Sequence, residues 1–277
     1  MALYTGPANL ELIAGPAHPK LGAAVARELR VTPLPQWIQR TDDGERLVRV
    51  DELARSRSVI IVQPIAPPVG DSLLELLLLA DGCWRVGARR VAAVVPYLGY
   101  LRQDRRVQAG DALGSRVLVD VLETGGFSPL FVIDPHTAGV EAAFEHPVEM
   151  LTAVPLLVDA IREQIGPESV IVAPDLGATK LARRFARRLR LPMAIVYKER
   201  LGPTDVRAHH IIGEVAGRQP IIVDDMISTG KTIAAAAELL LAAPAGGGDG
   251  YRPAAIRVPF PVPGGQRGAS PRRGPAS

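Results

Sequence analysis

Apolar stretches of two kinds alternate along the chain. Short runs rich in β-branched residues end in polar loops, which is typical of buried strands. Between them lie segments in which apolar residues recur every three or four positions, which is typical of helices. The predicted strands cover residues 59–63, 91–96, 130–133, 170–173, 193–196 and 221–223. The predicted helices cover residues 19–29, 72–86, 115–124, 153–164, 178–189 and 232–242.

The alternation of strand and helix predicts an α/β fold with parallel sheets covered by helices. Ligands of such folds bind beyond the carboxyl ends of the strands. With 277 residues the chain is long enough for two domains, and spacing alone divides it into 1–150 and 151–243. Residues 244–277 are rich in Gly, Pro, Arg and Ala and lack periodicity, so we expect most of this tail to be disordered.

Composition excludes several classes of protein. The longest apolar run, around residues 73–80, is interrupted by Glu75 and is far shorter than the ~20 residues of a membrane span. The N-terminus shows no secretion signal, so we expect a cytoplasmic protein. Cys83 is the single cysteine, which excludes an intrachain disulfide and a thiolate metal cluster. A net charge of +3 from scattered arginines does not favour nucleic acid as a partner.

The stretch IIVDDMISTGKT, residues 221–232, places two acids between a buried strand and a loop of small residues that leads into a helix. Backbone N–H groups of such a loop and of the helix N-terminus suit a phosphate monoester. The carboxylates suit sugar hydroxyls or a divalent cation, so a ribose phosphate satisfies both parts. A nucleotide P-loop is excluded, because it requires glycine five residues before Gly230, where the chain has Asp225. An ordinary strand-turn-helix corner is the alternative.

Four further segments carry candidate chemistry. PYLGYLRQDRR, residues 96–106, offers guanidinium groups for phosphate, although a solvated basic loop has the same composition. IDPHT and APDLG offer His136 and Asp175, and a lone histidine is often structural. YKERLGPTDVRAHH carries Lys198 and Arg200, two cations that suit charge developing in a phosphoryl-type transfer or form a solvated turn.

VDDMISTGKT resembles the ribose-phosphate loop of the type I phosphoribosyltransferase fold. The other motifs narrow the resemblance to the ribose-phosphate pyrophosphokinases, the phosphoribosyl pyrophosphate synthetases. They occur in the order of that family from about Leu10 to Leu241, beginning with ELIAGPAHPKLGAAVARELR, which is similar to the family's opening strand and helix. The resemblance implies two phosphoribosyltransferase-like domains. It also implies transfer of the β,γ-pyrophosphoryl group of MgATP to the C1 hydroxyl of ribose 5-phosphate, with release of AMP.

The resemblance also assigns roles to matching residues. The catalytic residues are Lys198 and Arg200. The ATP-binding residues are Asp43, Gly44, Glu45, Arg102 and Gln103. The ribose-phosphate-binding residues are Arg200, Asp224, Asp225, Ser228, Thr229, Gly230, Lys231 and Thr232. The ligands of the Mg²⁺ cofactor are His136 and Asp175. A homo-oligomer built from dimers, such as a hexamer, is implied because the Asp-Gly-Glu segment of the family reaches ATP in a neighbouring subunit.

Four departures from the family pattern are visible. Thr41 stands where the family has an aromatic residue, Lys231 replaces a glycine, Ser228 replaces the more frequent aspartate, and Pro135 replaces a leucine. The resemblance stops near Leu241, so we expect an incomplete second domain, and a reading-frame shift after about residue 243 is our hypothesis for the tail. A non-catalytic regulatory subunit and a nucleobase phosphoribosyltransferase remain as alternative functions.

Overall fold

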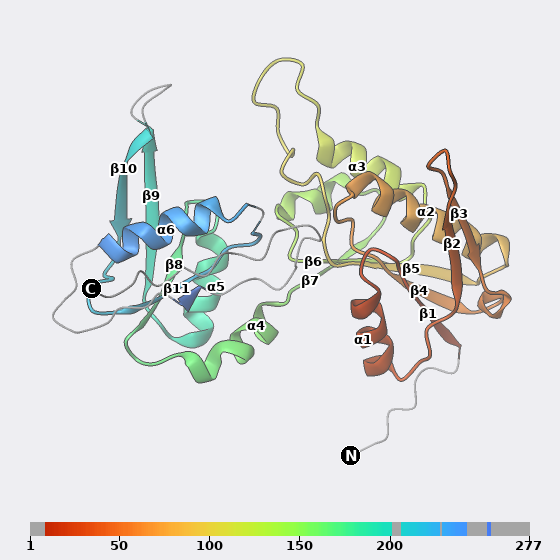
Figure 1. Ribbon diagram of the computed structural model, residues 1–277, viewed down its shortest axis with the longest axis horizontal. Coiled ribbons are helices and arrows are strands. Elements are labelled where there is room, and N and C mark those ends of the chain that lie inside the picture. The colour runs from red at the N-terminus through yellow and green to blue at the C-terminus, as the bar shows by residue number, and fades with distance from the viewer. Residues whose placement is uncertain (1–8, 201–205, 228, 243–253, 256–277) are drawn as a thin grey trace. The chain divides into compact units, whose positions relative to one another are not determined.

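The computed structural model describes residues 9–200, 206–227, 229–242 and 254–255, with only the backbone described at 198–200, 206–209 and 254–255. The chain divides into two compact units, Met1–Thr152 and Ala153–Ser277. Each unit contains one five-stranded sheet (Figure 1). The predicted α/β fold with helix-covered, mainly parallel sheets is confirmed.

The sheet of the first unit has the strand order β1-β4-β5-β6-β7, and all its neighbouring strands run parallel. Its strands are β1 (Leu10–Ala14), β4 (Ser58–Val62), β5 (Arg90–Val95), β6 (Leu130–Ile133) and β7 (Val148–Leu151). The strands predicted at 59–63, 91–96 and 130–133 therefore occur within one residue of their expected ends. β7 was not predicted from the pattern, because no position of this edge strand is fully buried.

Helices cover both faces of this sheet. They are α1 (Pro19–Leu29), α2 (Val69–Arg85) and α3 (Gly114–Glu123). Leu79 of α2 and Leu122 of α3 pack with Ile61 of β4 in one core, whereas α1 packs against the opposite face. The expected helix at 19–29 is confirmed, and α2 begins earlier than predicted because Pro68, with its fixed φ, forms the N-cap.

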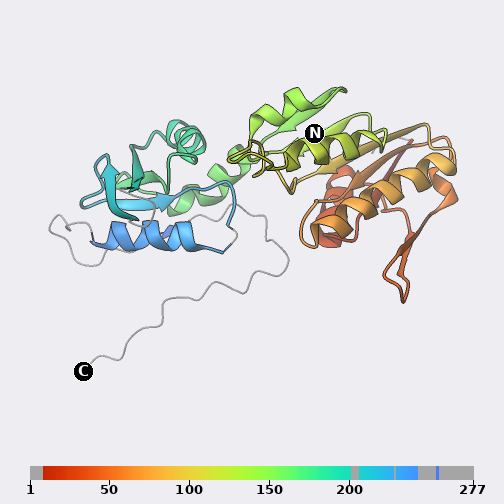
Figure 2. The same ribbon diagram turned by 90° about the horizontal axis from the view of Figure 1, so that it is seen from above.

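A hairpin of β2 (Gln36–Arg40) and β3 (Arg46–Val50) projects from the first unit (Figure 2). The sequence analysis did not predict this hairpin. Ile38 and Val48 on one face pack against the core of the unit, which includes residues of α2. The turn between the strands holds Gly44 at a φ of +93°, a conformation that favours glycine.

The sheet of the second unit has the order β10-β9-β8-β11-β12, with β10 antiparallel to β9 and the other pairs parallel. Its strands are β8 (Ser169–Ala173), β9 (Met193–Arg200), β10 (Val206–Ile212), β11 (Gln219–Ile222) and β12 (Ala254–Ala255). Its helices are α4 (Val154–Ile161), α5 (Thr179–Leu189) and α6 (Lys231–Ala242). Short 3₁₀ helices complete the two units at η1 (Glu52–Ala54), η2 (Ala138–Ala143) and η3 (Arg162–Gln164).

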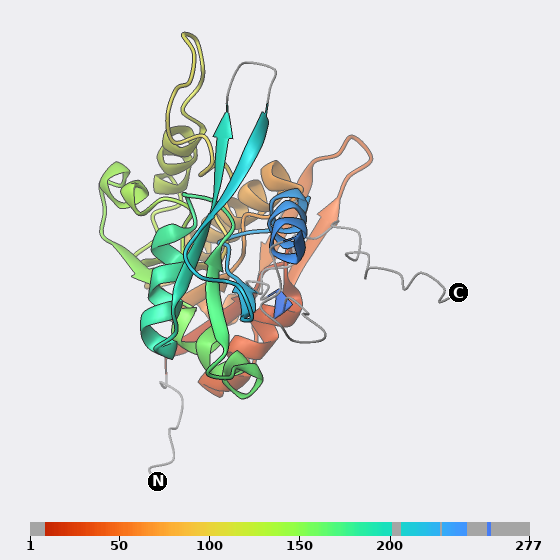
Figure 3. The same ribbon diagram turned by 90° about the vertical axis from the view of Figure 1, so that its left-hand side faces the viewer.

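Strand β8 is apolar at nearly every position because both of its faces are buried. Its residues alternate between two cores: Ile171 packs with α4 and α5, and Val172 packs with α6. Helix α6 lies on the opposite face of the sheet from α5 (Figure 3). A parallel strand buried on both faces has no solvent-facing positions. The helix predicted at 153–164 is interrupted, since α4 ends at Ile161 and η3 continues to Gln164.

The predicted disordered tail, 244–277, lies outside the described residues except for Ala254–Ala255. These two residues form β12, which pairs in parallel with Ile221 and Ile222 of β11. The edge of β11 supplies the backbone hydrogen-bond partners of this short pairing, which does not contradict a tail that is mostly disordered. None of the helices in the described ranges is long and apolar enough to cross a membrane.

Candidate active site

The predicted ribose-phosphate turn lies at the carboxyl end of β11. Beyond the last residue of the strand, Val223 still donates its backbone N–H to the carbonyl of Val172 at 3.0 Å, and Asp224 and Asp225 follow directly. Gly230, at a φ of +78°, precedes α6 and accepts a hydrogen bond from Ala234 N at 2.9 Å, so the helix starts immediately after the turn. The N–H groups of the first helical turn therefore lie next to the loop that the acids begin.

Burial and neighbouring charges act together on Asp224. Burial first, then the charge of Asp225 and its side-chain hydrogen bond, and finally the charge of Asp175, raise the pKa of Asp224 from its usual 3.8 to about 7. The backbone N–H of Asp225 donates to Asp224 Oδ1 at 2.9 Å and acts in the opposite direction. The carboxyl group therefore changes protonation near neutral pH, and such perturbed carboxyls are common at ligand sites.

Asp175 reaches this acidic pair from the neighbouring strand. It follows β8, which pairs in parallel with β11, so both strands end at the same edge of the sheet. Its Oδ1 accepts the backbone N–H of Ala178 at 3.0 Å, which fixes the side chain at the start of α5. The structure thus brings together three of the predicted residues, Asp175, Asp224 and Asp225, within the second unit.

Lys198 and Arg200 lie near the end of β9, the other neighbour of β8. Ala173, the last residue of β8, pairs with Ile195, so β9 continues beyond β8 at the same edge. The side chains of Lys198 and Arg200, residues 201–205 and Ser228 lie outside the described part of the chain. Thr229, Lys231 and Thr232 are exposed, with Lys231 N donating to Thr229 Oγ1 at 3.5 Å.

The predicted ATP-binding residues of the first unit occur in two separate places. Asp43, Gly44 and Glu45 are exposed and form the turn of the β2–β3 hairpin. Arg102 and Gln103 are exposed in the loop after β5, where Gln103 O accepts the N–H of Ser115 at 3.2 Å.

His136 follows β6 and is also exposed. Because β5 and β6 are parallel neighbours, the loops with Gln103 and His136 leave the same edge of the sheet. Asp134, two residues earlier, has a φ of +39° and accepts a hydrogen bond from Thr152 Oγ1 at 2.7 Å.

Thr41 has a role that the sequence analysis did not assign. Its hydroxyl donates to the carboxylate of Asp43, and this bond is the largest cause of the lowered pKa of Asp43. Its backbone N–H also donates to the carbonyl of Glu45 at 3.0 Å. Position 41 thus supplies polar contacts within the turn instead of an aromatic face. In the sequence, the Thr-x-Asp spacing was the feature that could have predicted these contacts.

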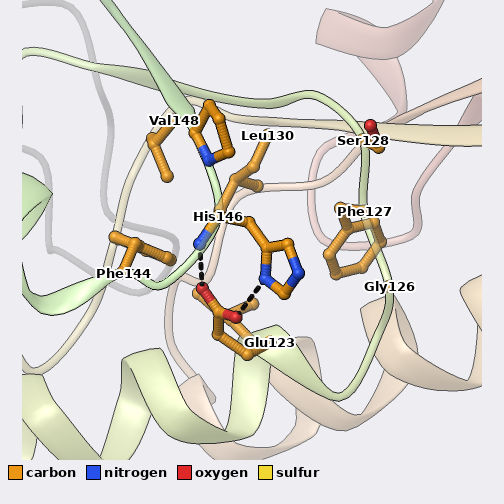
Figure 4. Close-up of a pocket in the computed structure, with 10 residues that line it drawn as sticks. Glu123, Gly126, Phe127, Ser128, Leu130, Phe144, His146 and Val148 are labelled. Atoms are coloured by element: carbon orange, nitrogen blue, oxygen red, sulfur yellow. Dashed lines mark hydrogen bonds and ion pairs between the residues drawn. The ribbon is translucent and has the colours of Figure 1, made fainter.

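A cavity of about 200 Å³ lies elsewhere in the first unit, between the end of α3 and the segment before β7 (Figure 4). Phe127 and Phe144 contribute apolar walls. Glu123 accepts the backbone N–H of His146 at 3.2 Å and pairs with His146 Nδ1 at 2.5 Å. The lining residues include none of the predicted site residues.

Two family profiles match the chain. The N-terminal domain of ribose phosphate pyrophosphokinase matches residues 10–126, and the phosphoribosyl transferase domain matches residues 148–245.

Individual proteins give the same result. A ribose-phosphate pyrophosphokinase of Gloeobacter violaceus is 39% identical over 237 residues, covering 85% of this chain and 71% of that protein. Another, of Caldanaerobacter subterraneus, is 35% identical over 242 residues, covering 87% and 76%. The crystal structure of phosphoribosylpyrophosphate synthetase from Mycobacterium smegmatis gives a TM-score of 0.79 at 34% identity, covering 86% of this chain and 78% of that chain. The resemblance noted in the sequence is confirmed, and the chain belongs to the ribose-phosphate pyrophosphokinase family.

Proposed function

We propose that the chain transfers the β,γ-pyrophosphoryl group of ATP to the C1 hydroxyl of ribose 5-phosphate. The C1 hydroxyl releases its proton to solvent as its oxygen forms a bond to the β-phosphorus, the bond from that phosphorus to the oxygen of the α-phosphate breaks, and AMP leaves. The product is 5-phosphoribosyl 1-pyrophosphate. Family membership supports this reaction, and the observation that carries it is the acidic turn between β11 and α6.

The acidic turn is the proposed site of ribose 5-phosphate. Asp224 and Asp225 accept hydrogen bonds from the ribose hydroxyls, and the backbone N–H groups of residues 228–232 hold the 5′ phosphate. This division of roles follows from charge: carboxylates repel a phosphate, whereas the N-terminal end of α6 attracts it. No acidic residue lies in the first turn of α6, so nothing there opposes the phosphate.

Lys198 and Arg200 are the proposed catalytic residues. Charge moves onto the transferred group and the departing AMP during the reaction, and positioned cations stabilise that charge. The backbone of β9 carries both residues to the edge of the sheet where β8 and β11 also end. Arg200 is also proposed to contact the ribose phosphate.

Mg²⁺ is the proposed cofactor, with His136 and Asp175 as its protein ligands. The acids of the second unit suit a hard cation electrostatically. The charges of Asp175 and Asp225 disfavour the charged form of Asp224, and a bound cation would relieve this repulsion. Among the described residues no group of three or more His, Cys, Asp and Glu side chains could hold a metal ion. A sparse protein ligand set is typical of Mg²⁺, which keeps waters and substrate phosphates. When bound, the cation neutralises phosphate charge.

The proposed ATP site uses the Asp43-Gly44-Glu45 turn together with Arg102 and Gln103. We also propose that the protein works in the cytoplasm as a homo-oligomer built from dimers, in which the hairpin turn contributes to the ATP site of a neighbouring subunit.

The decisive experiment measures AMP formation by the full chain from ATP, ribose 5-phosphate and Mg²⁺. AMP formation that requires ribose 5-phosphate supports the proposal. Folded protein without this activity indicates a regulatory subunit, and pyrophosphate release from phosphoribosyl pyrophosphate plus a nucleobase indicates a phosphoribosyltransferase.

Lys198→Ala tests the catalytic assignment. It is expected to lower kcat by about 100-fold or more with little change in KM for ribose 5-phosphate, because a charge that acts mainly in the transition state is lost. Lys180→Ala, at an exposed position of α5, is the control and should leave kcat unchanged. An unchanged rate in Lys198→Ala removes that residue from the mechanism.

A further inference from the structure

Arg46 is the first residue after the Asp43-Gly44-Glu45 turn, yet its side chain does not face solvent. Only 11% of it is exposed. Its Nε donates to Glu75 Oε1 at 2.9 Å and its Nη2 donates to Asp71 Oδ2 at 2.6 Å. Both acids belong to α2, which lies beside the hairpin (Figure 1), so this single guanidinium joins the hairpin to the helix.

The same guanidinium also reaches the turn itself. Arg46 Nη1 donates to the backbone carbonyl of Gly44 at 3.5 Å, a long bond compared with the two to α2. The hydrogen bond with Glu75 is the largest cause of the raised pKa of Arg46. A planar guanidinium with five N–H donors can make these three contacts at once, whereas a lysine ammonium cannot match their directions.

Behind Glu75 the contacts continue into the interior of the unit. Gln63, which is fully buried, donates from Nε2 to Glu75 Oε2 at 3.5 Å and to the carbonyl of Ser72 at 3.2 Å. Its Oε1 accepts the N–H of Ala17 at 3.1 Å. The polar contacts therefore extend from the hairpin turn, through α2, to the segment that follows β1.

The turn has little other support. Asp43, Gly44 and Glu45 are exposed, and their hydrogen bonds to Thr41 lie within the turn. The apolar anchors of the hairpin, Ile38 and Val48, lie farther along the strands. Arg46 is the side chain through which the turn is tied to the body of the unit.

We infer that Arg46 is a positioning residue: with Asp71 and Glu75 it holds the Asp43-Gly44-Glu45 turn in the arrangement that receives the nucleotide. This inference rests on the proposed function, in which the turn binds ATP. A binding segment that is ordered in advance loses less conformational entropy on binding, so the contribution of Arg46 is expressed as ATP affinity. The rate at saturating substrate and the KM for ribose 5-phosphate do not depend on it.

The test compares Arg46→Met with Arg49→Met in the full chain. Arg49 is on the same strand, but it is exposed and its guanidinium lies 5.3 Å from the centre of the Trp37 ring instead of on α2. Arg46→Met is expected to raise the ATP dissociation constant, measured by calorimetry, and the KM for ATP by about tenfold. The KM for ribose 5-phosphate should stay within about twofold. Arg49→Met should leave all three values unchanged.

A lower melting temperature with unchanged ATP affinity in Arg46→Met shows a merely structural role and overturns the inference. Should Arg46→Met fail to fold, Glu75→Gln gives the answer, since it keeps an oxygen acceptor but removes the charge that holds Arg46. We expect about threefold weaker ATP binding in Glu75→Gln, and unchanged binding overturns the inference.

Glu45→Ala separates the inference from the proposed function. Weaker ATP binding in Glu45→Ala but not in Arg46→Met overturns the positioning role alone. If neither variant weakens ATP binding, the ATP role of the turn is wrong and the positioning role falls with it. Failure of the wild-type chain to form AMP contradicts the proposed function, whereas the calorimetric comparison still decides the role of Arg46.

Discussion

Asp71 and Glu75 in the first unit and Asp224 and Asp225 in the second are both pairs of neighbouring acids, but their surroundings differ. The first pair faces Arg46, which contacts the two carboxylates at 2.6 and 2.9 Å. In the second pair, burial and the charges of Asp225 and Asp175 raise the pKa of Asp224 to about 7. Acids that are matched by a cation join parts of the fold, whereas acids that destabilise one another's charge suit a ligand that relieves the repulsion.

The largest expected effect comes from removing one charge from each pair in turn. Asp224→Asn should lower kcat/KM for ribose 5-phosphate by about 100-fold, because a hydrogen bond from a sugar hydroxyl to a charged acceptor contributes about 1.5–3 kcal/mol. Asp71→Asn should instead raise the KM for ATP and leave the KM for ribose 5-phosphate unchanged. Steady-state kinetics with each substrate varied in turn measures both. If the two variants affect the same substrate, the contrast between the pairs is wrong.

The acidic turn was predictable from sequence because its chemistry is local. Two acids, small residues and a helix follow one another in IIVDDMISTGKT, so the order of residue types predicts the order of elements. The same holds for β8 and β11, whose apolar runs are buried on both faces. The α1 helix occurs at the predicted residues for a similar reason, since its periodicity and its proline at the start both act locally.

The hairpin network was not predictable in this way. The alternation in QWIQR and RLVRV around Asp-Gly was a usable signal for two paired strands, and it was not used. Arg46 itself gave no signal, because an arginine in an alternating strand has the pattern of a solvated side chain. Its partners lie 25 and 29 positions along the chain, and only the packing of β3 on α2 brings them together.

A second experiment disturbs the Asp71-Glu75 pair through Gln63, the buried residue that contacts Glu75, without changing any charge. A Cβ on Gly15 would lie 2.1 Å from Gln63 Oε1 and 2.9 Å from Gln63 Cβ, and Gln63 is fully buried. Gly15→Ala should therefore lower the free energy of unfolding by about 1–3 kcal/mol, the usual cost of overpacking. Urea unfolding measures this change.

Gly70→Ala, in α2, is the matched control for Gly15→Ala. A Cβ there meets no atom within 4 Å, so a gain of about 0.5 kcal/mol is expected from the higher helix propensity of alanine. Equal unfolding midpoints for Gly15→Ala and the wild type would show that Gln63 can move aside, and that the polar contacts behind Glu75 are not rigid.

A smaller expected effect is a pH dependence of stability that arises at Asp224 in the second pair. The pKa of Asp224 is about 7 in the folded chain and near its usual 3.8 when unfolded, so the folded state holds this proton more strongly between those values. The contribution of Asp224 to stability is therefore greatest below pH 3.8 and is lost as pH rises through about 7. Asp224→Asn stays neutral and avoids this loss.

In the absence of divalent cations, the difference in unfolding free energy between Asp224→Asn and the wild type should be near zero at pH 4. It should favour the variant by about 1 kcal/mol at pH 8, after allowance for solvent screening of a half-buried group. Asp71→Asn should show the opposite sign at pH 8, because it removes a carboxylate that Arg46 stabilises. An Asp224→Asn variant less stable than the wild type at pH 8 would mean that the carboxylate is stabilised in the folded chain. Both acidic pairs would then be stabilised within the folded chain and would differ only in their partners. Repulsion between the acids would no longer favour ligand binding at the acidic turn.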